Sequence, residues 1–256
     1  MKLFGKIGKA GAVLLFWLAV WFLLALKVDK ELLLPSPVSV LTRTAQLIQT
    51  ARFWEITFET VGRIMFAVVI AVALGVIFSV ISACSLLFSR LLSPRISVMT
   101  TTPVASFIIL ALVWMGRDTV VMFVSVLMAM PIIYRSVSAG IRNTDEKLLE
   151  MAEVYRVPFI KRIKSIYFPC IMPYFLSALR SAMGLAWKAG IAAEVLTVPN
   201  NSIGKMIYES KLYFETADLF AWTLVVIAFS AFIEKIAMLI IGTAGRKYNV
   251  KEVKAL

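Results

Sequence analysis

The chain has 256 residues, of which 61% are hydrophobic, and its formal net charge is +12. A soluble domain contains about 45–50% apolar residues, so this composition excludes an ordinary soluble protein and predicts a membrane protein. The chain contains no histidine, and its two cysteines, Cys84 and Cys170, do not form a CxxC motif. A conventional zinc site and a catalytic triad with an imidazole base are therefore excluded, and we expect neither a metal site nor catalytic residues.

Apolar runs that are long enough to cross a membrane recur along the chain. A helix that spans the bilayer needs about 20 predominantly apolar residues. The first run is longer than the apolar core of a signal peptide, and Leu26–Val28 offers no small-residue cleavage site, so we expect it to be a membrane span. We predict an all-α membrane protein with about six transmembrane helices. These lie at about 11–28, 58–84, 96–115, 119–140, 171–198 and 218–242.

The basic residues are distributed unevenly between the two sides of these spans. If the N-terminus is cytoplasmic, most of the 27 lysines and arginines fall in cytoplasmic segments, and the largest group lies between residues 135 and 164. This is the positive-inside bias, and it places both termini in the cytoplasm. The net charge is therefore a signal of topology. Nucleic-acid binding is not expected, because no basic and aromatic module remains outside the spans.

The segment 29–57 separates the first span from the rest of the chain. Leu34–Pro37 is an extended breaker, and residues 38–54 then show helical spacing. This helix is expected to lie along the outer membrane interface, with Trp54 near the headgroups; the alternative is a solvated connector. At the start of the second span, Glu59 and Arg63 are spaced to form an i,i+4 ion pair.

Polar residues mark the third and fifth spans as candidates for a water-filled path. Three consecutive threonines, Thr100, Thr101 and Thr102, precede Pro103, which frees a carbonyl group that hydroxyls can satisfy. The third span therefore faces the interior of the bundle or a path, or it is a kinked helix with packing hydroxyls only. In the fifth span, we expect Arg180 and Glu194 to approach the two membrane edges and Lys188 to lie deep, where a charge is costly and marks a functional candidate.

The stretch Asp145–Pro169 is a polar island between two apolar runs. Its first half has an apolar face and an acidic face, its second half is basic, and Pro158 separates the halves. We expect two short helices at an angle. An interfacial hairpin on lipid would suit the basic half only, since anionic headgroups repel carboxylates, so a groove on a protein partner is favoured. The apolar face comprises Leu148, Leu149, Ala152 and Tyr155, and the acidic face comprises Glu146, Glu150 and Glu153.

This island resembles the EAA loop of the permeases of ABC importers. Glu150-Met151-Ala152 begins the pattern, Arg156 stands where the family has glycine, and Ile166–Pro169 closes it at matching spacing. The resemblance to the nitrate, sulfonate and taurine group extends over 34–242. It includes Leu34–Pro37, Pro103 to Gly116, the positions of Pro131, Gly140 and Asp145, and the pattern of Trp187, Ala193-Glu194 and Gly204.

The resemblance implies the type I ABC importer permease fold in a bacterial inner membrane. It implies an N-terminal helix and linker in 1–55, a permease domain in 56–242 with its coupling loop at 142–169, and a basic cytoplasmic tail in 243–256. The chain itself would be no enzyme and would hold no cofactor, since it lacks a phosphate-binding GxxxxGK[ST] loop; ATP and magnesium would bind a partner ATPase. Coupling to the ATPase would involve Glu150, Met151, Ala152, Glu153, Tyr155, Arg156 and Pro158.

The implied partners are two cytoplasmic ATPase subunits, a second copy of the permease, an extracytoplasmic solute-binding protein and membrane lipid. Closure of the ATPases on ATP would pull the loop as a lever and swing the fifth span. Arginine at position 156 implies a different bend from the one glycine supplies, with Pro158 providing it. The competing class is an ion-coupled secondary transporter, which would need deep acidic residues and broken helix pairs. A membrane-embedded enzyme is not expected, because no nucleophile and base pair is visible.

The path would be lined by residues of the third and fifth spans. A deep cation with hydroxyl groups suits a small anion such as a sulfonate, taurine or nitrate, whereas an aromatic ring suits a thiamine-precursor-like compound. The candidate path residues are Thr100, Thr101, Thr102, Trp187, Lys188 and Glu194.

Overall fold

The computed structural model of the chain describes residues 2–247, and every regular element in that range is helical. This confirms the all-α prediction; residues 248–256 of the predicted basic tail lie outside the described range. The elements are α1 (Lys2–Val28), α2 (Pro37–Ile48), α3 (Ala51–Cys84), α4 (Leu86–Thr101), α5 (Val104–Leu112), α6 (Arg117–Arg142), α7 (Glu146–Val154), α8 (Phe159–Arg162), the π-helix η1 (Ile163–Tyr167), α9 (Phe168–Thr197), α10 (Ile203–Leu212) and α11 (Thr216–Lys247).

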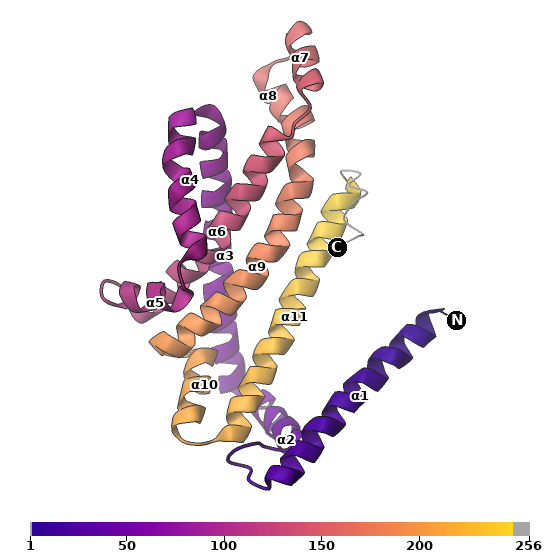
Figure 1. Cartoon of the computed structure of the whole chain (residues 1–256), viewed down its shortest axis with the longest axis vertical. Coiled ribbons are helices and arrows are strands. Elements are labelled where there is room, and N and C mark those ends of the chain that lie inside the picture. The colour runs from indigo at the N-terminus through magenta and orange to yellow at the C-terminus, as the bar shows by residue number, and fades with distance from the viewer. Residues whose placement is uncertain (1, 248–256) are drawn as a thin grey trace.

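The helices α3, α6 and α9 form the centre of the molecule, and α11 packs against α9 (Figure 1). Close approach of the backbones requires a small residue at the crossing. A Cβ atom on Gly190 of α9 would lie 2.7 Å from the side chain of Ile64 and 2.8 Å from the hydroxyl of Ser125. Glycine at position 190 therefore lets α9 touch α3 and α6 at the same point.

The two ends of this bundle carry different elements. At one end, α7 and α8 project beyond α6 and α9; at the other, α2 and α10 lie near the first turns of α3 and α11 (Figure 1). We call these the α7 end and the α10 end. The helix α1 diverges from the bundle, and its Trp21 stacks on Phe220 at a ring separation of 5.8 Å.

Several helix starts are fixed by side chains that accept hydrogen bonds from free backbone amides of the first turn, as expected for serine, threonine and aspartate at this position. In the predicted linker, Ser36 caps α2 and Pro37 occupies its first turn. Residues 38–54 do not form one helix, because the chain breaks at Gln49 and Thr50, where Thr50 caps α3. The ring nitrogen of Trp54 donates a hydrogen bond to the carbonyl of Ile48, 3.0 Å away, and holds this corner.

The predicted third span is not one helix. The chain breaks at Thr102-Pro103 into α4 and α5, and their axes differ by 101°. Thr102 is extended, as the residue before proline tends to be, and Pro103 has no amide hydrogen with which to continue α4. The prediction of a single helix over 96–115 is therefore wrong.

Length and composition identify fewer spans than the sequence pattern predicts. Within the described residues, α3, α6 and the Thr216–Leu239 part of α11 are long and apolar enough to cross a membrane. The bent pair α4 and α5 adds a fourth if it counts as one span. The segment predicted at 171–198 is helical within α9, and it carries Arg180, Lys188 and Glu194.

Candidate functional site

The predicted polar island forms two short helices at the α7 end. Asp145 caps α7 by accepting a hydrogen bond from the amide of Lys147, 2.9 Å away. Only Ala152 of this helix is buried, with 1% of its surface exposed. The acidic side chains Glu150 and Glu153 are both exposed. The helix therefore offers nearly its whole circumference to the surroundings.

Apolar side chains are also exposed on this part of the molecule. They lie on α7, just after it, and on α8, so that they surround the bend between the two helices. Apolar groups gathered on an exposed surface mark a contact site for another protein or a membrane. The exposed fractions are 51% for Met151, 79% for Val154, 75% for Tyr155, 71% for Phe159 and 79% for Ile160.

Arg156 adopts the left-handed conformation for which glycine is the usual residue, with φ 49°. The amide of Arg156 donates to the carbonyl of Glu153 at 2.9 Å, and the amide of Val157 donates to the carbonyl of Ala152 at 2.8 Å. This is the Schellman arrangement that closes a helix C-terminus. The expectation that arginine here implies a different bend is therefore wrong, since the arginine takes the left-handed conformation that glycine would supply.

Beyond this bend, Pro158 precedes α8 and the chain returns toward the bundle. Arg162 donates a hydrogen bond from Nε to the carbonyl of Val157, 2.9 Å away. The following turn widens into the π-helix η1, in which the amide of Phe168 donates to the carbonyl of Ile163. Pro169 lacks an amide hydrogen and crowds the preceding turn, which accounts for the wider turn at this point.

The loop is attached to α6 and α9 where these two helices are in close contact. A Cβ atom on Gly140 of α6 would lie 3.1 Å from the Cα atom of Ile171 in α9. The amide group of Asn143 donates a hydrogen bond to the hydroxyl of Tyr174, 3.0 Å away. The two helices that flank the loop are thus held together next to it.

The three threonines lie at the break between α4 and α5. Their hydroxyls donate hydrogen bonds to backbone carbonyls three or four residues earlier. Thr100 and Thr101 are exposed, and Thr102 is half-buried. Thr100 also accepts a hydrogen bond from Arg135 of α6, at 3.1 Å between Nη2 and Oγ1.

The candidate path residues of α9 have different environments. Trp187 is 1% exposed and donates from its ring nitrogen to the carbonyl of Val226 in α11, 3.3 Å away. Lys188 is exposed on the adjacent face of α9. Arg180 pairs with Glu234 of α11 at 3.3 Å. Among the described residues, no hydrogen bond or ion pair joins Lys188 to the three threonines.

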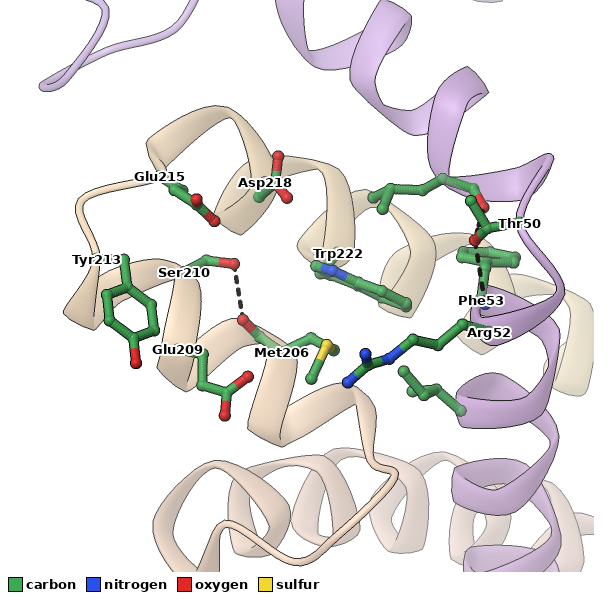
Figure 2. A pocket seen from close by; sticks show the side chains of 12 residues that line it. Thr50, Arg52, Phe53, Met206, Glu209, Ser210, Tyr213, Glu215, Asp218 and Trp222 are labelled. Carbon is green, nitrogen blue, oxygen red and sulfur yellow. Dashed lines mark hydrogen bonds between the residues drawn. The ribbon is translucent and has the colours of Figure 1, made fainter.

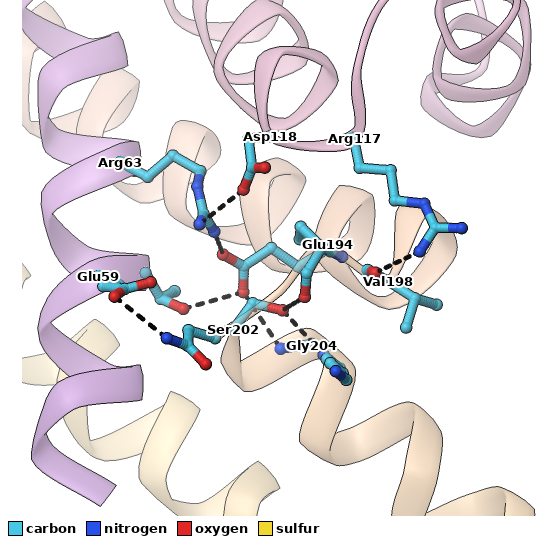
Figure 3. Close-up of polar contacts among 12 residues, drawn as sticks. Glu59, Arg63, Arg117, Asp118, Glu194, Val198, Ser202 and Gly204 are labelled. Atoms are coloured by element: carbon cyan, nitrogen blue, oxygen red, sulfur yellow. Dashed lines mark hydrogen bonds and ion pairs between the residues drawn. The ribbon is translucent and has the colours of Figure 1, made fainter. Parts of the chain in front are cut away.

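Glu194 is fully buried and stands at the centre of a charged network (Figure 3). Its Oε1 accepts from Arg63 at 2.6 Å, and its Oε2 accepts from the hydroxyl of Thr60 and the amide of Gly204, both at 3.1 Å. Arg63 also contacts Asp118 at 2.8 Å. The carboxylate thereby links α3, α6, α9 and α10, and its charge is compensated by a guanidinium and by two hydrogen-bond donors.

The sequence pattern paired Arg63 with the wrong carboxylate. Glu59 was expected as its i,i+4 partner, but Arg63 contacts Asp118 and Glu194 instead, and Glu59 accepts a hydrogen bond from Asn201 at 3.4 Å. Arg63 points into the bundle, where its side chain is 11% exposed. A charged residue within an apolar span was the available signal, but the sequence alone did not identify its partner.

Gly204 must be glycine for this network to form. A Cβ atom there would lie 2.5 Å from the backbone nitrogen of Val195. The start of α10 is therefore pressed against the end of α9, and the amide of Gly204 reaches Glu194. The last turn of α9 ends at Val198, which has φ 48° and whose carbonyl accepts a hydrogen bond from Arg117 at 3.2 Å.

A pocket of about 340 Å³ opens at the α10 end (Figure 2). Phe53 and Trp222, which stack at 5.3 Å, line it, and three carboxylates stand around it. Asp218 forms a two-bond ion pair with Arg43 of α2, and this hydrogen bonding raises the pKa of Arg43 above its ordinary value. The lining residues are Leu47, Thr50, Arg52, Phe53, Ile56, Met206, Glu209, Ser210, Tyr213, Glu215, Asp218 and Trp222.

These features define a helical membrane protein with an exposed helical loop at one end and a buried charge network near the other. Residues 75–248 match the family described as binding-protein-dependent transport system inner membrane component. The match covers more than half of the chain, so the chain belongs to this family. It includes the exposed loop, Glu194 and Gly204.

The chain is also similar to individual permeases. An aliphatic sulfonates transport permease protein of Bacillus subtilis, described as putative, is 24% identical over 80% of this chain and 74% of its own length. The taurine transport system permease protein of Escherichia coli is 22% identical over 91% and 85%. The nitrate import permease protein of Synechococcus elongatus is 26% identical over 76% and 73%.

The predicted resemblance is thus confirmed. The chain is an ABC importer permease of the sulfonate, taurine and nitrate group, and a multi-pass protein of the bacterial inner membrane. Its family is a membrane component of transport systems, which is not itself an enzyme.

Proposed function

We propose that this permease forms the path by which an ATP-driven importer carries a small anion across the inner membrane. The observation that carries the proposal is the loop at the α7 end. It exposes acidic and apolar side chains together, and it is joined to α6 and α9 at the point where these two helices are in contact. Such a loop can transmit the movement of a soluble partner to the bundle.

The partner at this end is a pair of cytoplasmic ATPase subunits, which bind ATP and magnesium. Each would hold one α7 helix in a surface groove. Glu150 and Glu153 would meet basic groups of the groove, and Met151 and Tyr155 would enter its apolar part. The Schellman closure at Arg156 and the start of α8 at Pro158 keep α7 at a fixed angle, so closure of the ATPases moves α6 and α9 together.

The membrane arrangement that fits this function has six spans and both termini in the cytoplasm. The α7 end is then cytoplasmic, which agrees with its basic residues, since positive charge gathers on that side. The spans would be α1, α3, the bent pair α4 and α5, α6, α9 and α11. The basic side chains at the α7 end are Arg142, Lys147, Arg156, Lys161, Arg162 and Lys164.

A second copy of the permease would complete the path. The helix α5 and the turn that follows it expose large apolar side chains, including Ile109 at 64%, Val113 at 72% and Trp114 at 72%. A partner copy can cover such a surface, and so can lipid. The domain assignment follows the same scheme, with the permease domain in 56–242 and the cytoplasmic tail in 243–256.

An extracytoplasmic binding protein would deliver the solute at the α10 end. The pocket there is lined by Met206, Glu209, Ser210, Tyr213 and Glu215 of the segment 199–217, together with residues of α2, α3 and α11. Its aromatic side chains and charged rim give a binding protein both apolar and ionic contacts.

The solute is an anion of the sulfonate, taurine or nitrate kind. The named relatives support this class. Within the chain, the exposed hydroxyl-bearing residues at the α4–α5 break and the exposed Lys188 supply polar and cationic groups along the proposed path. The alternative, an ion-coupled carrier, would need a free deep acid, and the fully buried Glu194 is instead paired with Arg63.

The test is uptake into proteoliposomes that contain the permease, its ATPase and the loaded binding protein. Glu150→Arg places a cation where an acidic side chain would meet the groove, and we expect it to abolish ATP-driven uptake while the permease remains folded. Glu31→Arg makes the same change of charge at an exposed glutamate between α1 and α2, whose carboxylate accepts one exposed hydrogen bond, from Ser39; it is the matched control and should leave uptake unchanged. Normal uptake by Glu150→Arg would refute the coupling role, and uptake without any ATPase would favour the carrier.

A further inference from the structure

One arginine stands out on the helix α6. From Val120 to Ile141, Arg135 is the single exposed residue, and all the others are buried or half-buried. Between the two exposed ends of α6, the neighbouring helices thus cover every residue except one, and the side chain of that residue is a cation.

Arg135 differs from three arginines that have acidic partners. Arg43 and Arg63 form ion pairs with acidic residues, and so does Arg180. In the part of the chain that the structure describes, no carboxylate lies within ion-pair distance of Arg135. Its one hydrogen bond goes to a neutral group, the hydroxyl of Thr100, at 3.1 Å.

The hydroxyl of Thr100 can only accept from Arg135, because its own hydrogen is directed to the carbonyls of Ile96 and Ser97. The threonine therefore orients the guanidinium without neutralising it. A guanidinium has five N–H donors in a planar fork, and one of them is used here. The remaining donors match the two oxygens of an oxyanion.

The position of Arg135 makes an unpaired charge significant. It lies seven residues before the end of α6 at Arg142, or about 10 Å along the helix. A charge within a membrane-spanning helix is costly unless water or a counterion accompanies it, and such residues mark ion and substrate pathways. It also lies beside the break between α4 and α5, where Thr100 and Thr101 are exposed.

Arg135 and Lys188 mark two different levels of the bundle. The hydroxyl of Ser125 in α6 donates to the carbonyl of Ala186 at 3.4 Å, so Lys188 lies near the level of Ser125. Arg135 lies ten residues further along α6, or about 15 Å closer to the α7 end. The two exposed cations therefore lie at different heights along the bundle and are too far apart to form one site.

We propose that Arg135, oriented by Thr100 at the α4–α5 break, is an anion-binding residue of the translocation path and engages the solute's oxyanion group on the α7 side. The inference rests on the proposed function, since it requires that the path carries anions. It adds a specificity-determining residue in α6 to the candidates in α4 and α9.

A labelling experiment tests the electrostatic part without any knowledge of the solute. Thr101→Cys is introduced into a permease in which Cys84 and Cys170 are replaced by alanine, and its reaction rates with an anionic and a cationic methanethiosulfonate are compared. Adding Arg135→Gln should lower the ratio of anionic to cationic rate roughly tenfold, because the cation attracts the anionic reagent. Adding Arg90→Gln, an exposed arginine near the start of α4, should leave the ratio unchanged.

An unchanged ratio in the Arg135→Gln variant would overturn the inference, and so would a Thr101→Cys thiol that reacts with neither reagent. The second measurement is ATP-driven uptake of radiolabelled taurine and nitrate by the reconstituted transporter. Arg135→Gln should reduce uptake about 10- to 100-fold and Arg135→Lys less, with ATP hydrolysis within about twofold of the unmodified protein. A parallel fall in ATP hydrolysis would indicate a structural role and refute the inference.

The two proposals fail in different ways. If the unmodified transporter moves no anion, the proposed function fails for these solutes, whatever the labelling shows. If the unmodified transporter imports an anion and Arg135→Gln imports it equally well, the proposed function stands and the inference about Arg135 is wrong.

Discussion

The α7 end and the network around Glu194 use charged residues in opposite ways. Near the α10 end, hydrogen bonds join residues 131, 134 and 143 positions apart in the chain and hold α3, α9 and α10 together around one buried carboxylate. In the α7 loop, the side chains of Asp145 and Arg162 bond only to residues two and five positions away. One region satisfies its charges internally, and the other leaves them exposed.

This difference separates stability from coupling. A change in the Glu194 network removes interactions that hold helices together, so its first effect is on the free energy of unfolding. A change at Glu150 or Tyr155 removes no side-chain hydrogen bond or ion pair within the described chain, so its effect should appear only in the presence of the ATPase. Substitutions at the two ends should therefore fall into two groups when stability and transport are measured together.

The largest effect is expected from Glu194→Leu. The change leaves Arg63 with only the half-exposed Asp118 as a partner and removes the acceptor of the Gly204 amide. Loss of one member of a buried ion pair costs about 3–5 kcal/mol, so the variant should unfold at a much lower temperature, or fail to accumulate. The measurement is thermal unfolding in detergent, followed by circular dichroism.

The double variant Arg63→Met, Glu194→Leu is the control for this prediction. It removes both charges, so the cost should be clearly smaller than the sum of the two single changes, with an interaction energy of about 1–3 kcal/mol. Additive costs would show that the two side chains are not energetically coupled, and that the network does not hold the α10 end in the way the geometry indicates.

Gly204→Ala should have the next largest effect. Its methyl group would collide with the backbone at Val195, which cannot move as a side chain would. Overpacking of this kind costs about 1–3 kcal/mol. Gly184→Ala, in α9, is the matched control because nothing lies within 4 Å of its Cβ position, and it should be neutral or slightly stabilising. Equal melting temperatures for the two variants would contradict the close contact of α9 and α10.

The sequence predicted the features that depend on composition and local pattern. The all-helical fold follows from long apolar runs, and the two short helices of the loop follow from the spacing of the acidic and apolar residues and from Pro158. The family assignment follows from motifs in a fixed order. Each of these is encoded within a short stretch of sequence.

Features that depend on distant residues could not be predicted in this way. The partner of Arg63 is Glu194, 131 positions away, and a local rule selected Glu59 instead. Residues 96–115 were expected to form one span despite Pro103, because local rules give the position of a break but not its angle. At Arg156 the side chain suggested a different bend, yet the backbone hydrogen bonds of the Schellman closure impose the left-handed conformation.

One residue with a strained backbone lies in each of the two regions, and relieving this strain should change the free energy of unfolding by a smaller amount. Val198 at the end of α9 and Arg156 after α7 both have left-handed backbone, which costs a residue other than glycine about 1–2 kcal/mol. Val198→Gly and Arg156→Gly should each stabilise the protein by up to about 1 kcal/mol, and Val198→Gly by more, since valine is β-branched. Chemical unfolding in detergent measures both.

The same two variants should differ in transport. Arg156→Gly keeps the conformation that positions α7, so uptake should be retained, whereas Arg156→Val should impair it by placing a β-branched residue at this position. A loss of uptake in Arg156→Gly, with stability unchanged or raised, would mean that the arginine side chain itself contacts the ATPase.

The smallest effect is expected at the edge of the α10 end, where Arg43 of α2 pairs with Asp218 of α11. The Arg43 side chain is 42% exposed, so water competes for the pair, and Arg43→Gln should cost only about 0.5–1 kcal/mol. The hydrogen bonds that Arg43 donates to Asp218 raise the pKa of Arg43, so the stabilisation from this arginine is complete below its ordinary pKa and is lost only as the pH rises through the raised value. The cost of Arg43→Gln should therefore be the same at pH 6 and at pH 9. This cost should fall with added salt, because the Arg43 pair is exposed while the Glu194 pair is not. A cost that salt leaves unchanged would place the Arg43 pair with the buried network rather than at the surface.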